Sequence, residues 1–528
     1  MPFTGEIAEL TIGQTGLTGT KNPATVNVEA LLTAQNLSYS EGTLQKEPGT
    51  AKYNSSAIAS TPSILGGHDW HPVDGTQRMV VVTSTGNLLK DAGTGDFATT
   101  LASSLTVTPD VVPQFIEGGK EAAANNRKLF IFTGLNAVQV LSGDGATTSA
   151  LATPPSDWSG GNQPRVGTIH EGRLWGAGNT NDPHRLYYSI TTDHEDLTGS
   201  GSGTLAIYPG EGLGIVGIYS FRSGLAVFKH PRGIYFVDTS DPSVGNWKVT
   251  KITDQIGTAW IGTSAAVEND VYFLDIAGNV RTLQTTDEFG DVSSTSVSDI
   301  HDMDPFIRDN LNFEHVRKWH MIYYTTKREV HIAVTGTGAT TNNSRLVVDL
   351  NRRDLPRFRF SWFDTPVSLW TRLVDNVPEL TGGANDGFVR RMDQSIRSHD
   401  GTGIPSVFQS PHWDLAHIDP QLGTVRKNGA FLELVLEPKG TWNLSVDILW
   451  DGAIHETIQF NMGTTGASLG SFVLGTSRLT EEGLVNHKRR ITGGGRRFGL
   501  IGSNSGDAQD FSLGRFYLHF HRGDEALR

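Results

Sequence analysis

The chain has 528 residues, 61 of them glycine, and its 43 lysines and arginines against 56 aspartates and glutamates give a net charge of −13. Because it has no cysteine, it cannot form disulfides or thiolate metal sites, and its negative charge disfavours tight, sequence-nonspecific binding to nucleic acid phosphates. No run of 18 apolar residues predicts a membrane span and no secretory signal is expected, so we expect a soluble protein made in a cytosol.

Short runs of Val, Ile, Phe and Tyr, bounded by Gly, Asn and Asp, recur along the chain. This pattern is typical of strands and hairpins, whereas no apolar stripe of helical period exceeds about three turns. We therefore predict an almost all-β protein. Residues 1–55 are mostly polar, and we expect them to form an N-terminal arm without a hairpin.

Seven segments share a pattern of a polar residue or glycine, an apolar strand, a turn and a second strand. They begin at Arg78, Lys128, Arg173, Gly224, Asp270, Glu329 and Glu379. The steps between them are 50, 45, 51, 46, 59 and 50 residues, close to the roughly 40–50 residues of a four-stranded propeller blade. We predict a β-propeller of about seven blades over residues 56–403. Six or eight blades are alternatives, as are unrelated hairpins in stacked sandwiches.

The length of the predicted strands increases after residue 403. The junction at 395–405 is rich in Gly and Ser and ends in Pro405, which is typical of a domain boundary. Longer apolar strands follow, as in residues 431–452 and 515–523. We predict that residues 404–528 form a β-sandwich-like or jelly-roll-like domain that serves as a platform or docking domain.

Three stretches of the sequence carry a resemblance to a known family. The first runs from Gly16-Leu17-Thr18 through Asn36-Leu37 to residues 41–49; the second comprises residues 185–197, the strand at 213–218 and the hairpin at 225–235; the third runs from residues 488–498 to 516–523. These three stretches resemble the sequences of the tail nozzle proteins of short-tailed bacteriophages, also called tail tubular protein B or tail stabilisation proteins. Glu47-Pro48 departs from that pattern, in which a basic residue is commoner.

The resemblance implies a structural virion protein of the phage tail, assembled in the host bacterial cytoplasm. It implies a homo-oligomeric ring, a hexamer, that extends the channel for DNA ejection, with DNA present only in transit. The ring would contact adaptor or portal proteins on one side and tail fibre or needle proteins on the other. We also expect no enzymatic activity, no catalytic residue and no cofactor, because the sequence holds no catalytic constellation.

Basic residues form two candidate partner-contact regions. Arginines alternate with aromatic residues in the first, at Arg352, Arg353, Arg357 and Arg359. The second holds Lys488, Arg489, Arg490, Arg496 and Arg497. Arginine pairs with carboxylates or phosphates and stacks on flat groups, so a subunit or partner contact is one interpretation. Neutralisation of the protein's own acidic groups is the other.

No motif proposes catalysis or metal binding. The richest candidate metal cluster, Asp299, His301, Asp302 and Asp304, lacks the glycine and distal glutamate of a calcium loop, which favours a solvated acidic stretch before a helix. His519 and a second histidine two positions later share one face of a strand, and a surface strand explains them. No paired carboxylates or nucleophile elbow with triad context are apparent.

The alternative function is a carbohydrate- or receptor-binding propeller module of a tail. Four tryptophans, Trp70, Trp175, Trp260 and Trp362, recur near the predicted blade strands and could stack on sugar rings. Packing in the core is the favoured interpretation of all four. A glycan hydrolase is the third and least favoured reading.

Overall fold

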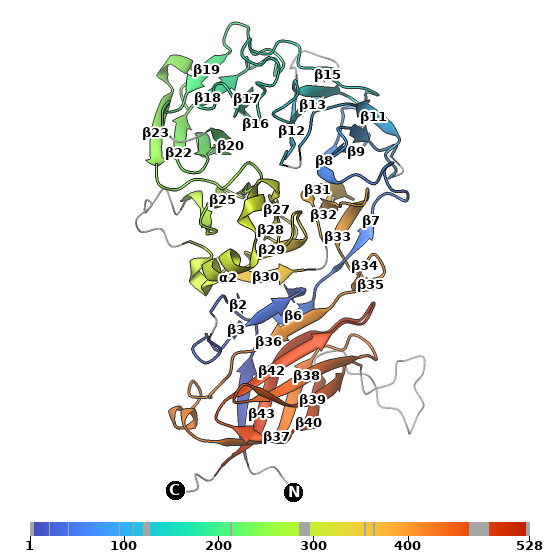
Figure 1. Cartoon of the computed structure of the whole chain (residues 1–528), viewed down its shortest axis with the longest axis vertical. Coiled ribbons are helices and arrows are strands. Elements are labelled where there is room, and N and C mark those ends of the chain that lie inside the picture. The colour runs from blue at the N-terminus through green and yellow to red at the C-terminus, as the bar shows by residue number, and fades with distance from the viewer. Residues whose placement is uncertain are drawn as a thin grey trace.

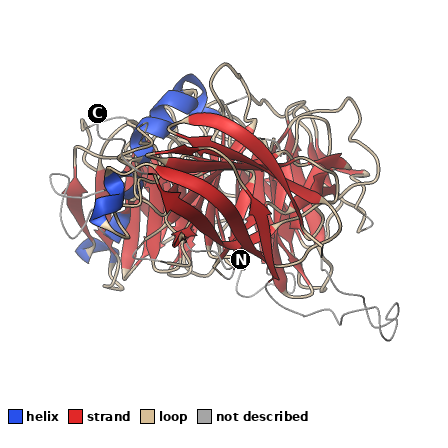
Figure 2. Cartoon of the chain, turned by 90° about the horizontal axis from the view of Figure 1, so that it is seen from below, coloured by secondary structure: helices blue, strands red, loops and turns tan. Residues whose placement is uncertain are grey.

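The computed structural model describes residues 5–20, 22–40, 42–93, 95–108, 110–119, 127–211, 214–284, 296–352, 355–362, 365–463 and 485–523. Strands account for nearly all of its regular structure (Figure 2). In Figure 1 a ring of short sheets stands above a narrower body of long strands, and both termini lie at the lower end of that body. The predicted all-β class, a propeller with an added sandwich-like domain, is confirmed.

Seven strand groups form the ring. The first two blades are β8 (Ile64–Trp70), β9 (Arg78–Thr83), β10 (Leu88–Lys90), β11 (Thr99–Ala102), then β12 (Gln114–Gly119), β13 (Arg127–Phe132), β14 (Gln139–Ser142), β15 (Ser149–Ala150). The next two are β16 (Val166–His170), β17 (Arg173–Ala177), β18 (Arg185–Tyr188), β19 (Gly203–Ala206), then β20 (Ile215–Phe221), β21 (Gly224–Lys229), β22 (Ile234–Asp238), β23 (Lys248–Thr253).

The last three blades include one with three described strands and two that are the ends of larger sheets. The fifth blade contains β24 (Ser264–Val267), β25 (Asp270–Leu274) and β26 (Val280–Thr282). The sixth contains β27 (His320–Tyr324), β28 (Glu329–Val334), β29 (Ser344–Asp349) and β30 (Arg357–Ser361). The seventh contains β31 (Ser368–Val374), β32 (Val377–Gly383), β33 (Val389–Gln394) and β7 (Gly49–Lys52). The expectation of about seven blades is thus confirmed.

Each predicted hairpin supplies the second and third strands of one blade. In the fourth blade, for example, β21 and β22 pair with each other and are flanked by β20 and β23. Every residue of β21 is buried, because neighbouring blades cover both faces of the sheet. Second strands therefore read as continuous apolar runs rather than as an alternation of apolar and polar residues.

The N-terminal segment closes the ring. Its strand β7 pairs antiparallel with β33 and forms the outer strand of the seventh blade. Asn54, which is fully buried just after β7, donates from Nδ2 to Gly387 O at 3.1 Å and accepts from the Val389 backbone nitrogen at 2.8 Å. This pairing removes a free strand edge from the last blade.

The lower body is a sandwich of two layers. One layer contains β1 (Glu6–Thr11), β5 (Leu37–Ser40), β6 (Thr43–Lys46), β37 (Lys427–Leu436), β40 (Val485–Arg490), β41 (Gly494–Gly495) and β43 (Ser512–Arg522). The other contains β4 (Thr33–Gln35), β36 (Ser406–Gln409), β42 (Phe498–Asn504), β38 (Asn443–Trp450) and β39 (Ala453–Asn461). Short pairs β2 (Gly16–Leu17) with β3 (Ala30–Leu31), and β34 (Ser398–His399) with β35 (Thr402–Gly403), lie beside them.

One nine-stranded sheet runs from the ring into the sandwich. Strand β4 pairs with β30 of the sixth blade on one side and with β36 of the sandwich on the other. A single hydrophobic core follows the same route, and includes Val330 and Leu346 of the sixth blade, Leu37 of the N-terminal segment and Leu434 of the sandwich. The two bodies therefore share both hydrogen bonds and buried apolar surface.

The expectation that residues 1–55 lack a hairpin is wrong. Strands β5 and β6 form an antiparallel hairpin whose turn holds Gly42 at a φ of +78°. The signal is weak in the sequence because only Leu37, Tyr39 and Leu44 are apolar. Their side chains face the shared core, and the polar residues Ser38 and Lys46 of the same strands are buried as well.

Helical elements are short. They are η1 (Val244–Asn246), η2 (Asp299–His301), α2 (Met303–Asn310), η3 (Phe313–Lys318) and η4 (Pro420–Gly423). Helix α2 and its neighbours η2 and η3 lie between the fifth and sixth blades in the chain and account for the long step between those two repeats. Among the described residues, no helix has the length and apolar character needed to cross a bilayer.

Candidate partner-contact surfaces

Two of the predicted contact residues, Arg357 and Arg359, lie on β30, all of whose residues are buried. The Arg359 guanidinium donates to Glu329 Oε2 at 2.8 Å and lies 3.5 Å from Glu47 Oε1. Arg357 donates to Asp349 Oδ2 at 2.5 Å. This arrangement corrects the predicted partner-contact role of both arginines, because each neutralises carboxylates of its own chain inside the fold.

The same buried network contains His331 and Arg345. Glu47 accepts a hydrogen bond from Arg345. His331 Nε2 donates to Glu329 at 3.0 Å, and His331 Nδ1 accepts from Arg345 at 2.9 Å. Burial lowers the pKa of His331 to about 4, so its imidazole is neutral at pH 7. Burial alone would raise the pKa of Glu329, but Arg359 and His331 hold it below its ordinary range.

Arg352 lies outside this network, on a groove at the waist between the ring and the sandwich. The groove encloses a volume of about 520 Å³ and is lined by N-terminal residues and by loops of the sixth blade. Lys327 and Arg397 also line it, but each pairs with an aspartate, at 2.7 and 2.9 Å. Arg352 is exposed and makes no ion pair with any described residue. Arg353 lies outside the described residues.

Lys488, Arg489 and Arg490 lie on β40, the edge strand of one sandwich layer. All three side chains are exposed. The Lys488 ammonium lies 4.8 Å from the centre of the Phe431 ring and 3.4 Å from His519 Nδ1. An exposed edge strand that carries three cations can receive an acidic surface of another molecule.

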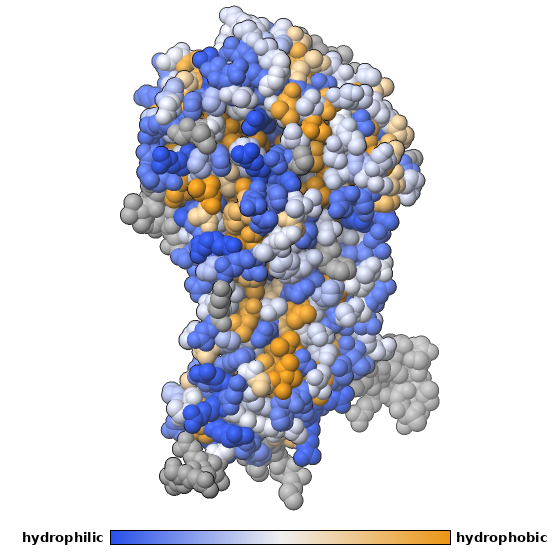
Figure 3. Space-filling view, in the orientation of Figure 1, coloured by the Kyte–Doolittle hydropathy of each residue, from blue (hydrophilic) through white to orange (hydrophobic). Residues whose placement is uncertain are grey.

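Arg496 and Arg497 follow β41 at the same end of the molecule. Their backbone nitrogens both donate to Asp451 Oδ1 at 2.9 Å, which fixes the turn. Their side chains are exposed. The contact role of these two arginines and of the β40 cations stays a prediction. Figure 3 shows apolar residues on this lower body framed by hydrophilic ones, a mixture typical of contact surfaces.

The candidate metal cluster does not converge in the fold. The ring of His301 lies 2.6 Å from a backbone carbonyl, Asp302 accepts from a threonine hydroxyl at 2.5 Å, and Asp304 lies near a serine. His519, expected on a surface strand, is buried and lies 3.1 Å from a glutamate carboxylate. Within the described part of the chain, no group of three or more such residues could hold a metal ion.

The four tryptophans divide into two classes. Trp70 and Trp175 are fully buried in blade cores, as the core interpretation predicts. Trp362 is 36% exposed and packs on Phe360, with ring centres 4.3 Å apart. Trp260 is partly buried and lines a cavity at the mouth of the ring.

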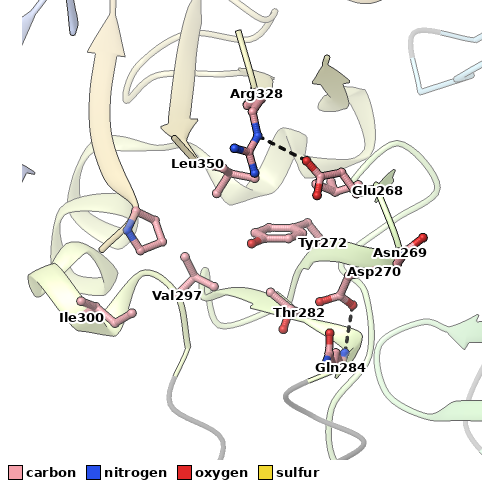
Figure 4. A pocket seen from close by; sticks show the side chains of 12 residues that line it. Glu268, Asn269, Asp270, Tyr272, Thr282, Gln284, Val297, Ile300, Arg328 and Leu350 are labelled. Atoms are coloured by element: carbon pink, nitrogen blue, oxygen red, sulfur yellow. Dashed lines mark hydrogen bonds and ion pairs between the residues drawn. The ribbon is translucent and has the colours of Figure 1, made fainter. Parts of the chain in front are cut away.

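A cavity of about 380 Å³ separates the fifth and sixth blades (Figure 4). Its two carboxylates already have partners: Glu268 lies 3.3 Å from Arg328 Nε, and Asp270 accepts from the backbone nitrogen of Gln284 at 2.9 Å. The ring of Tyr272 lies between these two pairs in the figure. Burial raises the pKa of Asp270, while hydrogen bonds from backbone nitrogens such as that of Gln284 oppose this rise. Both acids thus have structural roles.

The segment that joins β11 to β12 closes one mouth of the ring. Asn136 exchanges two hydrogen bonds with the backbone of Thr106, both of 2.8 Å. Val112 reaches across to the fifth blade, where a Cβ at Gly262 would come within 3.3 Å of it. Cavities of about 240 and 210 Å³ flank Val111 and Val112, and residues of six blades line them. The axial opening on this face is therefore plugged.

Comparisons with known proteins give matches among solved structures. No family model and no curated protein sequence matches this chain. Similar solved structures include the computationally designed Ika8 protein, at 10% identity and a TM-score of 0.36, covering 73% of this chain and 100% of the other. YCF48 bound to D1 peptide gives 13% identity and a TM-score of 0.39, covering 69% and 98%. At such scores the architecture rests on the strand pairing of the chain itself.

Proposed function

We propose that this chain is a non-enzymatic structural subunit of a bacteriophage tail, which assembles into a ring-shaped nozzle. The ring would extend the DNA ejection channel and hold adaptor or portal proteins and tail fibres or a needle. The observation that carries the proposal is the nine-stranded sheet shared by ring and sandwich, since it makes one rigid body with two surfaces for different neighbours. The three stretches that resemble nozzle proteins support the same function.

In this proposal DNA passes between copies of the chain and not through one propeller. Val111 and Val112 plug the axial mouth of each propeller, and the cavities beside them are too small for a duplex. A lumen formed by several copies with a net charge of −13 each would repel the phosphates and let DNA slide. The exposed cations of β40 would then face a neighbouring subunit or tail protein.

Measurement of the assembled mass tests the proposal. We expect the purified chain, mixed with the portal and adaptor of its phage, to form a ring whose mass is a fixed multiple of the subunit mass. Arg489→Glu on β40 should weaken assembly without lowering the melting temperature. Lys248→Glu, an equally exposed strand cation on the propeller, is the matched control and should assemble normally. A chain that stays monomeric with those partners, yet binds glycans, would contradict the nozzle function.

A carbohydrate- or receptor-binding module is the second candidate function. It is favoured by one observation, the partly buried Trp260 in an open cavity at the propeller mouth.

A further inference from the structure

The cavity at the propeller mouth has the position of a ligand site. It lies beside the points where the chain enters the first strand of several blades, and its volume is about 240 Å³. Thr133 belongs to the second blade, Arg165 to the third, Trp260 to the fifth and Arg317 to the sixth. Blades that lie on different sides of the ring thus contribute to one cavity, which places it on the propeller axis.

Two arginines in this cavity have no carboxylate partner. No aspartate or glutamate of the described residues lies within 4.0 Å of the guanidinium of Arg165 or Arg317. Elsewhere, Arg372, Arg390 and Arg397 have side chains that are 14–16% exposed, and each lies within 2.9 Å of a carboxylate oxygen. Arg165, which is partly buried, and Arg317, which is exposed, lack such a carboxylate among the described residues, so both guanidiniums are open to a ligand in the axial cavity.

Both arginines are held in place. The stem of Arg165 packs against Gly134, where a Cβ would come within 2.4 Å of its Cγ. The Arg317 guanidinium covers the Trp260 ring at 4.5 Å, a cation–π contact that fixes its plane. Two like charges that face one small volume repel each other, so a bound anion would relieve an unfavourable arrangement that is already built.

The remaining polar groups select the kind of anion. Asp110 also lines the cavity, so two positive charges and one negative charge suit a single negative charge better than a doubly charged phosphate. Thr133 Oγ1 accepts two hydrogen bonds from Asn136, which leaves its own proton to donate. Asp110 can accept from ligand hydroxyls. The cavity is also smaller than the roughly 300–1,000 Å³ of sites for drug-sized ligands.

We propose that the axial cavity binds an acidic monosaccharide, with its carboxylate between Arg165 and Arg317 and its hydroxyls toward Asp110 and Thr133. The proposal goes beyond the nozzle function, because ring assembly needs no small ligand. It gives the plugged face of the propeller a recognition role for charged surface glycans.

Titration calorimetry on the full chain tests this site, with glucuronate and N-acetylneuraminate as probes. We expect at least one of the two acids to bind saturably with one site per chain, while glucose does not bind. Arg165→Met and Arg317→Met should each weaken binding by at least about tenfold, since each removes a charged hydrogen-bond donor. Arg352→Met, which removes an exposed and unpaired arginine outside the cavity, should leave the affinity unchanged.

Two further measurements keep the result unambiguous. Asp110→Asn should shift the preference toward inorganic phosphate, and its fold is not at risk because the side chain is exposed. Arg165→Met should still form the ring with portal and adaptor, so a failed site and a failed nozzle are distinguished. Three results would each overturn the proposal: neither acid binds saturably, binding survives Arg165→Met, or phosphate binds as tightly as the acidic sugar.

Discussion

His331 makes the buried charge network depend on pH. Its Nδ1 accepts from Arg345, so a proton on that atom would place a third positive charge beside two buried guanidiniums. The burial-lowered pKa of about 4 compares with an ordinary value of 6.5. Between these pH values the unfolded chain binds more protons than the folded chain. The free energy of unfolding therefore decreases as the pH falls from 6.5 to 4.

We expect that loss to be on the order of 3 kcal/mol from His331 alone. Urea unfolding at pH 7, 5.5 and 4 measures it. His331→Gln, which keeps a polar group of similar reach but cannot titrate, should remove this share of the dependence between pH 6.5 and 4 and leave the share of His320, whose pKa burial also lowers to about 4. An unchanged pH profile in that variant would show that His331 is not the titrating group.

Arg359 is the residue whose loss should harm the network most. Arg359→Met would remove a buried cationic partner from both Glu329 and Glu47. Removal of one member of a buried ion pair costs about 3–5 kcal/mol. The control Arg352→Met removes an exposed arginine from the loop between β29 and β30, and should change stability by no more than about 0.5 kcal/mol. Chemical denaturation of both variants measures the two losses of unfolding free energy. A large loss in Arg359→Met alone would show that burial, not position in the sequence, determines the loss.

The arginines show what sequence can and cannot predict about a site. Arg357 and Arg359 alternate with Phe358 and Phe360, which reads as a strand with one polar and one apolar face. Strand β30 instead lies between β29 and β4, and both of its faces are covered. Asp349 and Glu329, which pair with these arginines, lie 8 and 30 positions away, but Glu47 lies roughly 300 positions away, a distance that no local pattern contains.

Among the elements, the seven hairpins were predictable and their flanking strands were less so. Second strands carry apolar runs and are joined to the third strands by turns, whereas outer strands such as β15 (two residues, both exposed) carry almost no signal. The N-terminal strands were missed for a related reason, since each is only two to six residues long and is stabilised by strands from distant segments. Long-range pairing overrides weak local preference there.

Asn54 fastens the N-terminal segment to the seventh blade. Asn54→Ala would leave the buried nitrogen of Val389 and the carbonyl of Gly387 without their side-chain partner. We expect a loss of about 2–3 kcal/mol, the cost of leaving buried polar groups unsatisfied. Thermal melting of this variant beside Asn269→Ala, an exposed asparagine in a turn, measures the difference. Equal melting temperatures would mean that the blade closes without this contact.

At the scale of the whole molecule, ring and sandwich should unfold together. The shared sheet and the shared core leave no boundary with few contacts across it, which independent domains require. We expect one calorimetric transition, with the same midpoint by near-ultraviolet circular dichroism and by tryptophan fluorescence. Two separated transitions would show that strand β4 does not couple the two bodies.

The closure of the ring by β7 sets an order of events during synthesis. Asn54 and its partner Val389 are 335 positions apart. At the usual rate of about 5–20 residues per second, a ribosome needs roughly 20–70 s to make the chain between them. Throughout that time β7 lacks its partner strand β33, and its edge is exposed to other nascent chains. The last blade therefore completes only when the oldest part of the chain meets one of the newest, and synthesis cut short before β33 yields an open ring.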